Sequence, residues 1–318
     1  GSDVIINLNV DVNLSGTGVV GLGFDSANNL QTFKGTFNGN NHKITLAIGE
    51  PYGKRGDAAI DTSAGNGKIY RHTRLGLFAA IGGGATVNDL IVDGSIKFDN
   101  GLGVDAGSLA ATITGNAALN GVTCNAAVTC DDTFGNEANI GGIAGSVRGG
   151  GTVTFDSSNM SGITKAQATI NTGATLNGNT RIGGAIGYVG DYVSTFDVKS
   201  LQVSGSIDSK ASSTADSKFD VNSAKIAQVG GFIGCITQGS QQKNVNIMGL
   251  SFNSFNMTVG KNGDAKKGAG GLLGYSWGNT VVTIGDSGKN TSDSTYALKT
   301  NSASITANDS EELGGLVY

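Results

Sequence analysis

Carboxylates are the side chains of this sequence whose type could support a reaction. Asp131 and Asp132 are adjacent, and Asp93, Asp99 and Asp197 stand alone. Glycoside hydrolysis uses two carboxylates at a fixed separation, one of which is protonated. None of these acids lies in the Asn-Thr-Asp, Gly-Asp-Asp or Gly-His-Gly contexts of polygalacturonase-like enzymes. The sequence therefore favours solvated loop or edge carboxylates and predicts no catalytic residue.

Histidines and cysteines give no catalytic or zinc pattern either. The two histidines are His42, which follows a turn, and His72, which lies between two arginines where its pKa would not favour a base. The three cysteines, Cys124, Cys130 and Cys235, form no C-x2-C motif. Buried unpaired thiols are the favoured interpretation, and a Cys124–Cys130 disulfide stays open as the alternative.

The opening segment alternates apolar and polar residues. Ile6, Leu8, Val10, Val12 and Leu14 share one face, which predicts a strand with one buried side. The other face carries Asn7, Asn9, Asp11 and Asn13, and a polar turn spans residues 261–264. These oxygens could hold Ca²⁺, but the Gly-Gly-x-Gly-x-Asp nonapeptide is missing. We therefore predict no metal and no cofactor, and expect Asn and Asp to satisfy backbone groups at corners.

Glycine pairs followed by two apolar or small residues provide the structural pattern. The blocks begin at Gly141, Gly183, Gly230, Gly270 and Gly314, and the first four end with a third glycine. Successive blocks are 42, 47, 40 and 44 residues apart. A repeat of this length is typical of a solenoid or propeller, in which each unit buries its apolar side only against its neighbours.

A shorter spacing lies inside each repeat. Gly76 precedes Gly94 by 18 residues, and Gly184 precedes Gly205 by 21 residues. This half-period predicts an all-β parallel β-helix with about 20 residues per coil and a rod roughly 60 to 70 Å long. Glycine would supply positive φ at the corners and close approach between coils. A β-propeller with blades of about 40 residues is the alternative fold.

Composition agrees with a β-rich chain. The sequence has 318 residues with 53 glycines, one proline, 14% charged residues and a net charge of −4. No basic cluster could neutralise a run of phosphates, and no uninterrupted apolar run is long enough to span a membrane, so we expect neither nucleic acid nor membrane insertion. We predict one domain over residues 1–318: a less regular part at 1–74 with a polar excursion at 50–74, and regular repeats at 75–318. The chain is expected to be a fragment of a longer protein.

Aromatic residues provide the candidate ligand surface. Tyr188 and Tyr275 each lie four residues after the second glycine of their block, and Tyr192 and Trp277 are close by. Such rings stack on sugars through their apolar faces. Ser146 and Cys235 occupy the equivalent positions in other repeats, so the row is broken. Interior or corner packing is therefore the favoured alternative for these rings.

The order of these elements resembles GLUG-motif repeats. The resemblance rests on the Gly-Gly-apolar-apolar-Gly blocks, the entry at Gly76-Leu77-Phe78, the Val-x-Gly-x-Ile segments and the upstream segment from Phe37 to Ile44. It covers roughly residues 30–318, with a degraded block at 107–110. It implies a right-handed parallel β-helix in a bacterial cell-surface or secreted protein such as an adhesin, and brings no catalytic residues.

These observations predict a structural and binding module rather than an enzyme. The expected protein is a rigid, extracellular β-helical rod that mediates adhesion to a host or cell-surface glycan or protein. Weak contacts repeated along one face would give it avidity. The alternative function is a β-helix polysaccharide lyase or glycoside hydrolase.

Overall fold

Four parallel β-sheets build the fold. The computed structural model describes residues 3–17, 21–23, 30–49, 73–98, 104–130, 137–157, 160, 162–167, 169–172, 179–190, 195–209, 227–237, 242–259, 267–276, 279–285, 298–307 and 312–314. Within these ranges there is no helix, and hence none long and apolar enough to cross a membrane. Each coil of the chain contributes in turn to sheets I, II, III and IV.

The strands of the four sheets are as follows. Sheet I contains β5 (Thr73–Leu75), β9 (Val104–Gly107), β14 (Glu137–Gly141), β19 (Asn179–Gly183), β23 (Ala227–Gly230), β27 (Lys267–Gly270) and β31 (Glu312–Gly314). Sheet II contains β6 (Phe78–Gly82), β10 (Ala110–Thr114), β15 (Ala144–Arg148), β20 (Ile186–Val189), β24 (Ile233–Ile236) and β28 (Leu273–Ser276). Sheet III contains β1 (Ile5–Asn7), β3 (Thr36–Asn38), β7 (Ala85–Asn88), β11 (Ala117–Asn120), β16 (Thr152–Phe155), β21 (Thr195–Val198), β25 (Lys243–Ile247) and β29 (Thr280–Ile284). Sheet IV contains β2 (Val12–Asn13), β4 (Lys43–Ile48), β8 (Ile91–Phe98), β12 (Thr123–Cys124), β13 (Ala127–Cys130), β17 (Thr164–Ala166), β18 (Thr169–Thr172), β22 (Leu201–Ser209), β26 (Leu250–Val259) and β30 (Lys299–Ala307).

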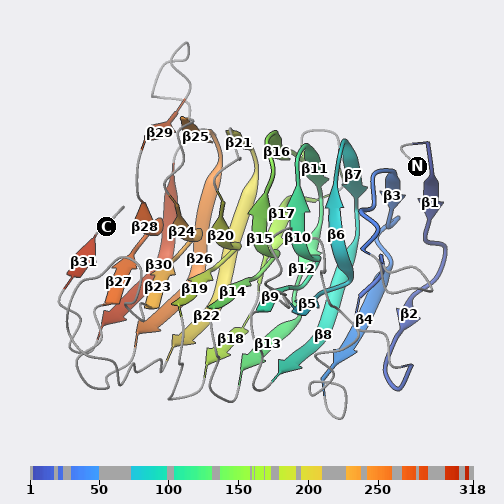
Figure 1. The fold of residues 1–318 in the computed structure, drawn as a ribbon, viewed down its shortest axis with the longest axis horizontal. Coiled ribbons are helices and arrows are strands. Elements are labelled where there is room, and N and C mark those ends of the chain that lie inside the picture. Colours follow the sequence, from blue (N-terminus) through green and yellow to red (C-terminus); the bar gives the residue numbers. More distant parts are fainter. Residues whose placement is uncertain are drawn as a thin grey trace, which may run out of the picture.

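All pairings between these strands are parallel. The strands lie side by side along one axis, with the two ends of the chain at opposite ends of the stack (Figure 1). This confirms the all-β parallel solenoid. It excludes the β-propeller, whose blades are antiparallel.

The predicted coil of about 20 residues is wrong, because one coil contains a whole repeat. Ala144 pairs with Ile186, 42 residues later, and Ile186 pairs with Ile233, 47 residues later. Gly94 and Gly205 lie in sheet IV with φ of 100° and 91°, halfway round the coil from the glycine blocks. The half-period therefore marks two sides of one wide coil. The ladder from Ile6 to Ile284 crosses the eight strands of sheet III seen in the described residues, a length of about 34 Å rather than 60 to 70 Å.

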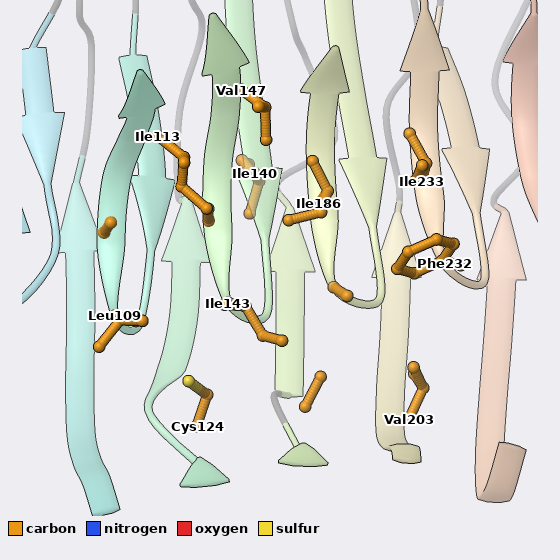
Figure 2. Close-up of a cluster of buried hydrophobic side chains, with 14 of the residues drawn as sticks. Leu109, Ile113, Cys124, Ile140, Ile143, Val147, Ile186, Val203, Phe232 and Ile233 are labelled. Carbon is orange, nitrogen blue, oxygen red and sulfur yellow. The ribbon is translucent and has the colours of Figure 1, made fainter. Parts of the chain in front are cut away.

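All four sheets contribute to the buried core, and both residues that follow the glycine pair belong to it in each block that the structure describes there. Leu109, Ile143 and Phe232 lie along the stack at the tips of three of the glycine turns, and Ala185 is the equivalent residue of the turn between Ile143 and Phe232 (Figure 2). The ring of Phe232 meets those of Phe155 and Phe196 edge to face, with centroids 6.2 and 6.5 Å apart. Like side chains thus stack on one another and exclude water from the interior.

An asparagine ladder runs along the corner between sheets III and IV. The side-chain amide of Asn38 donates to Asn7 at 2.9 Å, that of Asn88 to Asn38 at 2.9 Å, and that of Asn120 to Asn88 at 3.0 Å. Stacked amides satisfy one another at the spacing of the rungs. Asparagine at this corner therefore supports the coil register, as expected for polar corner residues.

The opening segment does not form the single strand predicted from its alternation. Only β1 and β2 are strands there, and Ile6 and Val10 are 39% and 64% exposed. The chain turns from sheet III to sheet IV between them, and β1 has a described neighbour, β3, on one side only. Leu8, Val12 and Leu14 are partly buried and pack against the core, so the predicted buried side is formed only in part.

Candidate functional site

Sheets I and II face each other across the turns that the glycine blocks make. In the central coils, a strand of sheet I ends at the first glycine and a strand of sheet II begins three residues later, as in β14 and β15. A Cβ on Gly187 would lie 2.5 Å from the backbone nitrogen of Ile140 and 2.6 Å from the carbonyl oxygen of Gly145. The third glycine thus lets the two sheets approach to backbone contact.

None of the block glycines in the described residues has a positive φ. The predicted role in close approach is confirmed for them, whereas the predicted positive φ belongs to glycines elsewhere, such as Gly94 and Gly205. Their missing side chain, rather than their backbone freedom, is what the turn requires.

Two facing ladders of polar and aromatic side chains fill the space between sheets I and II, and we call them the seam. The sheet I ladder stands two residues before the first glycine of the block in five successive coils and comprises Arg74, Asp105, Asn139, Arg181 and Gln228, after which Gly268 occupies the next rung. The sheet II ladder comprises Thr112, Ser146, Tyr188, Cys235 and Tyr275. Both ladders therefore follow the repeat, one residue per coil.

Asp105 is the charged centre of the seam and is 1% exposed. It accepts hydrogen bonds from Asn139 Nδ2 at 2.7 Å, Ser146 Oγ at 2.9 Å and Thr112 Oγ1 at 3.1 Å. A guanidinium nitrogen of Arg148 lies 3.6 Å from its Oδ1. These contacts replace the water that the carboxylate has lost. Because it is enclosed, Asp105 is placed to order the seam rather than to meet a substrate.

The seam reaches solvent at an Arg–Tyr cluster formed by Arg148, Arg181, Tyr188 and Thr237. The guanidinium carbons of Arg181 and Arg148 lie 4.3 and 4.9 Å from the centroid of the Tyr188 ring, a cation–π geometry. The Tyr188 hydroxyl is 3.2 Å from Thr237 Oγ1. The side chain of Arg148 is 34% exposed. Guanidinium donors beside an aromatic ring are groups that sugars and polar peptides contact.

The structure places two of the four aromatic candidates. Tyr188 and Tyr275 occupy one ladder, with Cys235 between them and Ser146 on the other side of Tyr188. Both tyrosines are partly buried. Tyr192 and Trp277 lie outside the described residues, in the connections that follow β20 and β28.

The structure describes two of the five carboxylate candidates, Asp93 and Asp197. Asp93 lies 3.8 Å from the amine of Lys43 and accepts the N–H of Gly94 at 2.8 Å. Asp197, on β21, accepts from the amide of Asn246 at 2.9 Å. Both are partly buried surface residues of separate sheets. Asp99, Asp131 and Asp132 lie outside the described residues.

Asp11, one of the calcium candidates of the opening segment, and the histidine candidate His42 lie together at a corner of the coil. Asp11 accepts the backbone N–H of Lys43 at 2.9 Å, and its Oδ1 lies 3.2 Å from His42 Nδ1. These contacts, led by the Lys43 N–H, lower the pKa of Asp11. Among the described residues there is no group of three or more His, Cys, Asp or Glu that could hold a metal ion. His72 and residues 261–264 lie outside those residues.

The three cysteines are free and buried, which confirms the unpaired thiols and excludes the Cys124–Cys130 disulfide. Burial raises the pKa of Cys124 to about 12 from its ordinary value of 9.0. The unfolded chain would release this proton near pH 9, whereas the native thiol would keep it. The stabilisation that results is full below pH 9 and is lost as the pH rises toward 12.

We expect the native protein to resist thiol reagents. The thiolate is the reactive form, and both burial and the raised pKa of Cys124 withhold it. Iodoacetamide at pH 8.5 should leave the native chain unlabelled and add three groups after denaturation in urea, as read by intact mass. Rapid labelling of the native chain would contradict the buried placement.

The buried sheet I ladder is the feature that sequence reasoning missed. Its signal was present, since a polar residue stands two positions before the first glycine in several repeats: Arg74, Asp105, Asn139, Arg181 and Gln228. Comparing the repeats at that position would have revealed the ladder. An isolated Asp105 gives no sign of its burial, because three of the residues that enclose it, Asn139, Ser146 and Arg148, come from the next coil.

Comparisons with known proteins assign the chain to no family: it matches no protein-family model, no curated protein and no solved structure.

Proposed function

We propose that this chain is a structural and binding module, a rigid β-solenoid rod within a bacterial cell-surface or secreted protein that mediates adhesion. The observation that carries the proposal is the stacking of each glycine block on the next in continuous parallel sheets. This repeat is used for architecture, as in proteins that project or present a surface. The resemblance to GLUG-motif repeats supports the extracellular bacterial setting.

The contact that we assign to the module lies at the Arg–Tyr cluster. It joins a partly buried ring, two guanidiniums and a threonine hydroxyl where the seam meets solvent. The connections that follow β20 and β24 begin at this point, and connections are where binding residues concentrate. A host or cell-surface glycan or protein is the proposed partner.

Screening the purified protein on glycan and host-protein arrays tests this proposal. We expect Tyr188→Ala to weaken a positive interaction about tenfold or more, because an aromatic anchor is removed. Tyr188→Phe should retain most of it. Lys199→Ala, on the surface beside sheet III, is the control that should bind like the wild type.

Two experimental results would contradict the proposal. Binding that is unaffected by Tyr188→Ala would remove the cluster from the proposal. Release of products from pectin, glycosaminoglycan or mucin would overturn the scaffold function in favour of the enzyme, if it disappears when Asp131 and Asp132 are replaced.

A further inference from the structure

The two guanidiniums of the Arg–Tyr cluster are oriented from inside the seam. Arg148 Nε donates to Ser146 Oγ at 3.3 Å, and Nη2 of Arg148 lies 3.6 Å from Asp105 Oδ1. Arg181 Nη1 donates to Asn139 Oδ1 at 3.1 Å. Asn139 and Ser146 in turn donate to Asp105 at 2.7 and 2.9 Å, so one buried carboxylate anchors the supports of both arginines. Side chains that are fixed in advance lose little conformational entropy when they bind a ligand.

The cluster presents hydrogen-bond donors. A guanidinium has five N–H donors and no acceptor. The Thr237 hydroxyl donates to the carbonyl oxygen of Val189 at 3.3 Å, so it accepts the hydrogen of the Tyr188 hydroxyl, which is 3.2 Å away. The tyrosine hydrogen is thus used within the protein. The ligand group that complements such a cluster is an acceptor with a negative charge.

The Tyr188 ring aligns the two guanidiniums. Those of Arg181 and Arg148 lie over it, 4.3 and 4.9 Å from its centroid. The planar fork of a guanidinium matches the two oxygens of a carboxylate, which it can bind through two parallel hydrogen bonds. The side chain of Arg148 is 34% exposed and that of Arg181 is partly buried, so both are within reach of a group that arrives from solvent.

The position of the cluster in sheet II favours a glycan over an extended peptide. Extended peptides bind most readily by adding a strand to an open sheet edge. Tyr188 lies on β20, whose two edges are paired with β15 and β24. The net charge of the chain is −4, so attraction to an acidic ligand has to come from local groups rather than from the whole molecule.

We propose that the Arg–Tyr cluster binds the carboxylate of an acidic sugar, such as a uronic or sialic acid, within a glycan. Arg148 and Arg181 pair with the carboxylate, and Tyr188 is a positioning residue that holds them. This inference rests on the proposed function, in which the cluster is the contact of the module, and it names the chemistry of the ligand.

Polygalacturonate and its methyl-esterified form provide a matched pair of probes, because they share one sugar chain and differ in the charge of the carboxyl groups. Biolayer interferometry with the purified protein should show binding to polygalacturonate that is about tenfold or more tighter, since charge-assisted hydrogen bonds are lost on esterification. High salt should weaken this binding. Polyglutamate, the acidic peptide probe, should bind more weakly than polygalacturonate.

Variants then locate the site. Arg181→Gln should weaken binding to polygalacturonate about tenfold or more and remove the preference over the ester, whereas Arg181→Lys should keep part of both because it keeps the charge but not the fork. Lys199→Gln is the matched control, since it removes one positive charge from a solvated ion pair elsewhere on the surface and should bind like the wild type. Circular dichroism and thermal unfolding verify that each variant is folded.

The outcomes separate this inference from the proposed function. Equal binding of the two polymers by the wild type would overturn the inference whether or not the variants fold, and so would tighter binding of polyglutamate. A loss in Lys199→Gln as large as that in Arg181→Gln would overturn it as well. A neutral glycan whose binding Tyr188→Ala abolishes would overturn the inference and leave the proposed function standing. The absence of binding to both polymers and to every array member would remove both.

Discussion

Gly234→Ala is expected to destabilise the solenoid by about 3 kcal/mol or more, as overpacking does where the surroundings cannot move. Gly234 is the third glycine of its block. A Cβ there would lie 2.6 Å from the carbonyl oxygen of Gly187 and 2.6 Å from the backbone nitrogen of Ile182. Both contacts are with backbone in the neighbouring coil, so no side chain can turn away. Sheets I and II would have to separate. Urea unfolding followed by circular dichroism measures the loss.

Gly162→Ala provides the control for this prediction. Gly162 has no positive φ, and an added Cβ would meet nothing within 4 Å. Its replacement should change the free energy of unfolding by no more than about 0.5 to 1 kcal/mol, in the stabilising direction if the unfolded chain loses entropy. Equal effects at the two positions would show that close approach is not what the block glycines provide.

The spacing of the glycine blocks predicted the stacking correctly because the glycine block of one coil lies beside the glycine block of the next coil. A Cβ on a block glycine would meet the backbone of the neighbouring coil, as a Cβ on Gly234 would meet Gly187. The distance between blocks is therefore the distance round one coil. The inner spacing joins a glycine block to a glycine of sheet IV on another side of the same coil. Gly94 and Gly205 have positive φ within sheet IV, and a sequence does not distinguish this requirement for glycine from that of the blocks.

The candidate site could be predicted only in part. The shared position of Tyr188 and Tyr275 followed from counting, since the register repeats with the block. Their surroundings did not follow, because Arg181 reaches Tyr188 from sheet I and Arg148 reaches it from the preceding coil. Periodicity locates residues along a ladder. It does not indicate which two ladders face each other, and that pairing creates the seam.

Asp105→Leu is expected to cost about 3 to 5 kcal/mol, the loss typical of breaking a buried charged network from one side. Leucine has a similar size but accepts no hydrogen bond. Asn139 Nδ2 and the Ser146 hydroxyl would each lose the acceptor they now have at 2.7 and 2.9 Å. The guanidinium of Arg148 would lose its nearby carboxylate. Asp105→Asn should cost less, because it keeps one oxygen for Asn139 and the hydroxyls can turn to accept from the new amide.

Asp156→Ala is the matched control, because it removes an acid whose partner is solvated. Asp156 Oδ2 lies 2.9 Å from Lys199 Nζ, and the two side chains are 24% and 48% exposed. The hydrogen bond to Asp156 raises the pKa of Lys199, so the pair stabilises the fold below the ordinary lysine pKa and loses that effect as the pH rises above it. An exposed pair contributes at most about 1 kcal/mol.

Urea unfolding at pH 7 should therefore rank the losses of stability in the order Asp105→Leu, then Asp105→Asn, then Asp156→Ala. If Asp105→Leu left stability unchanged or raised it, the seam would be held together by packing alone, and its buried charge would need another explanation.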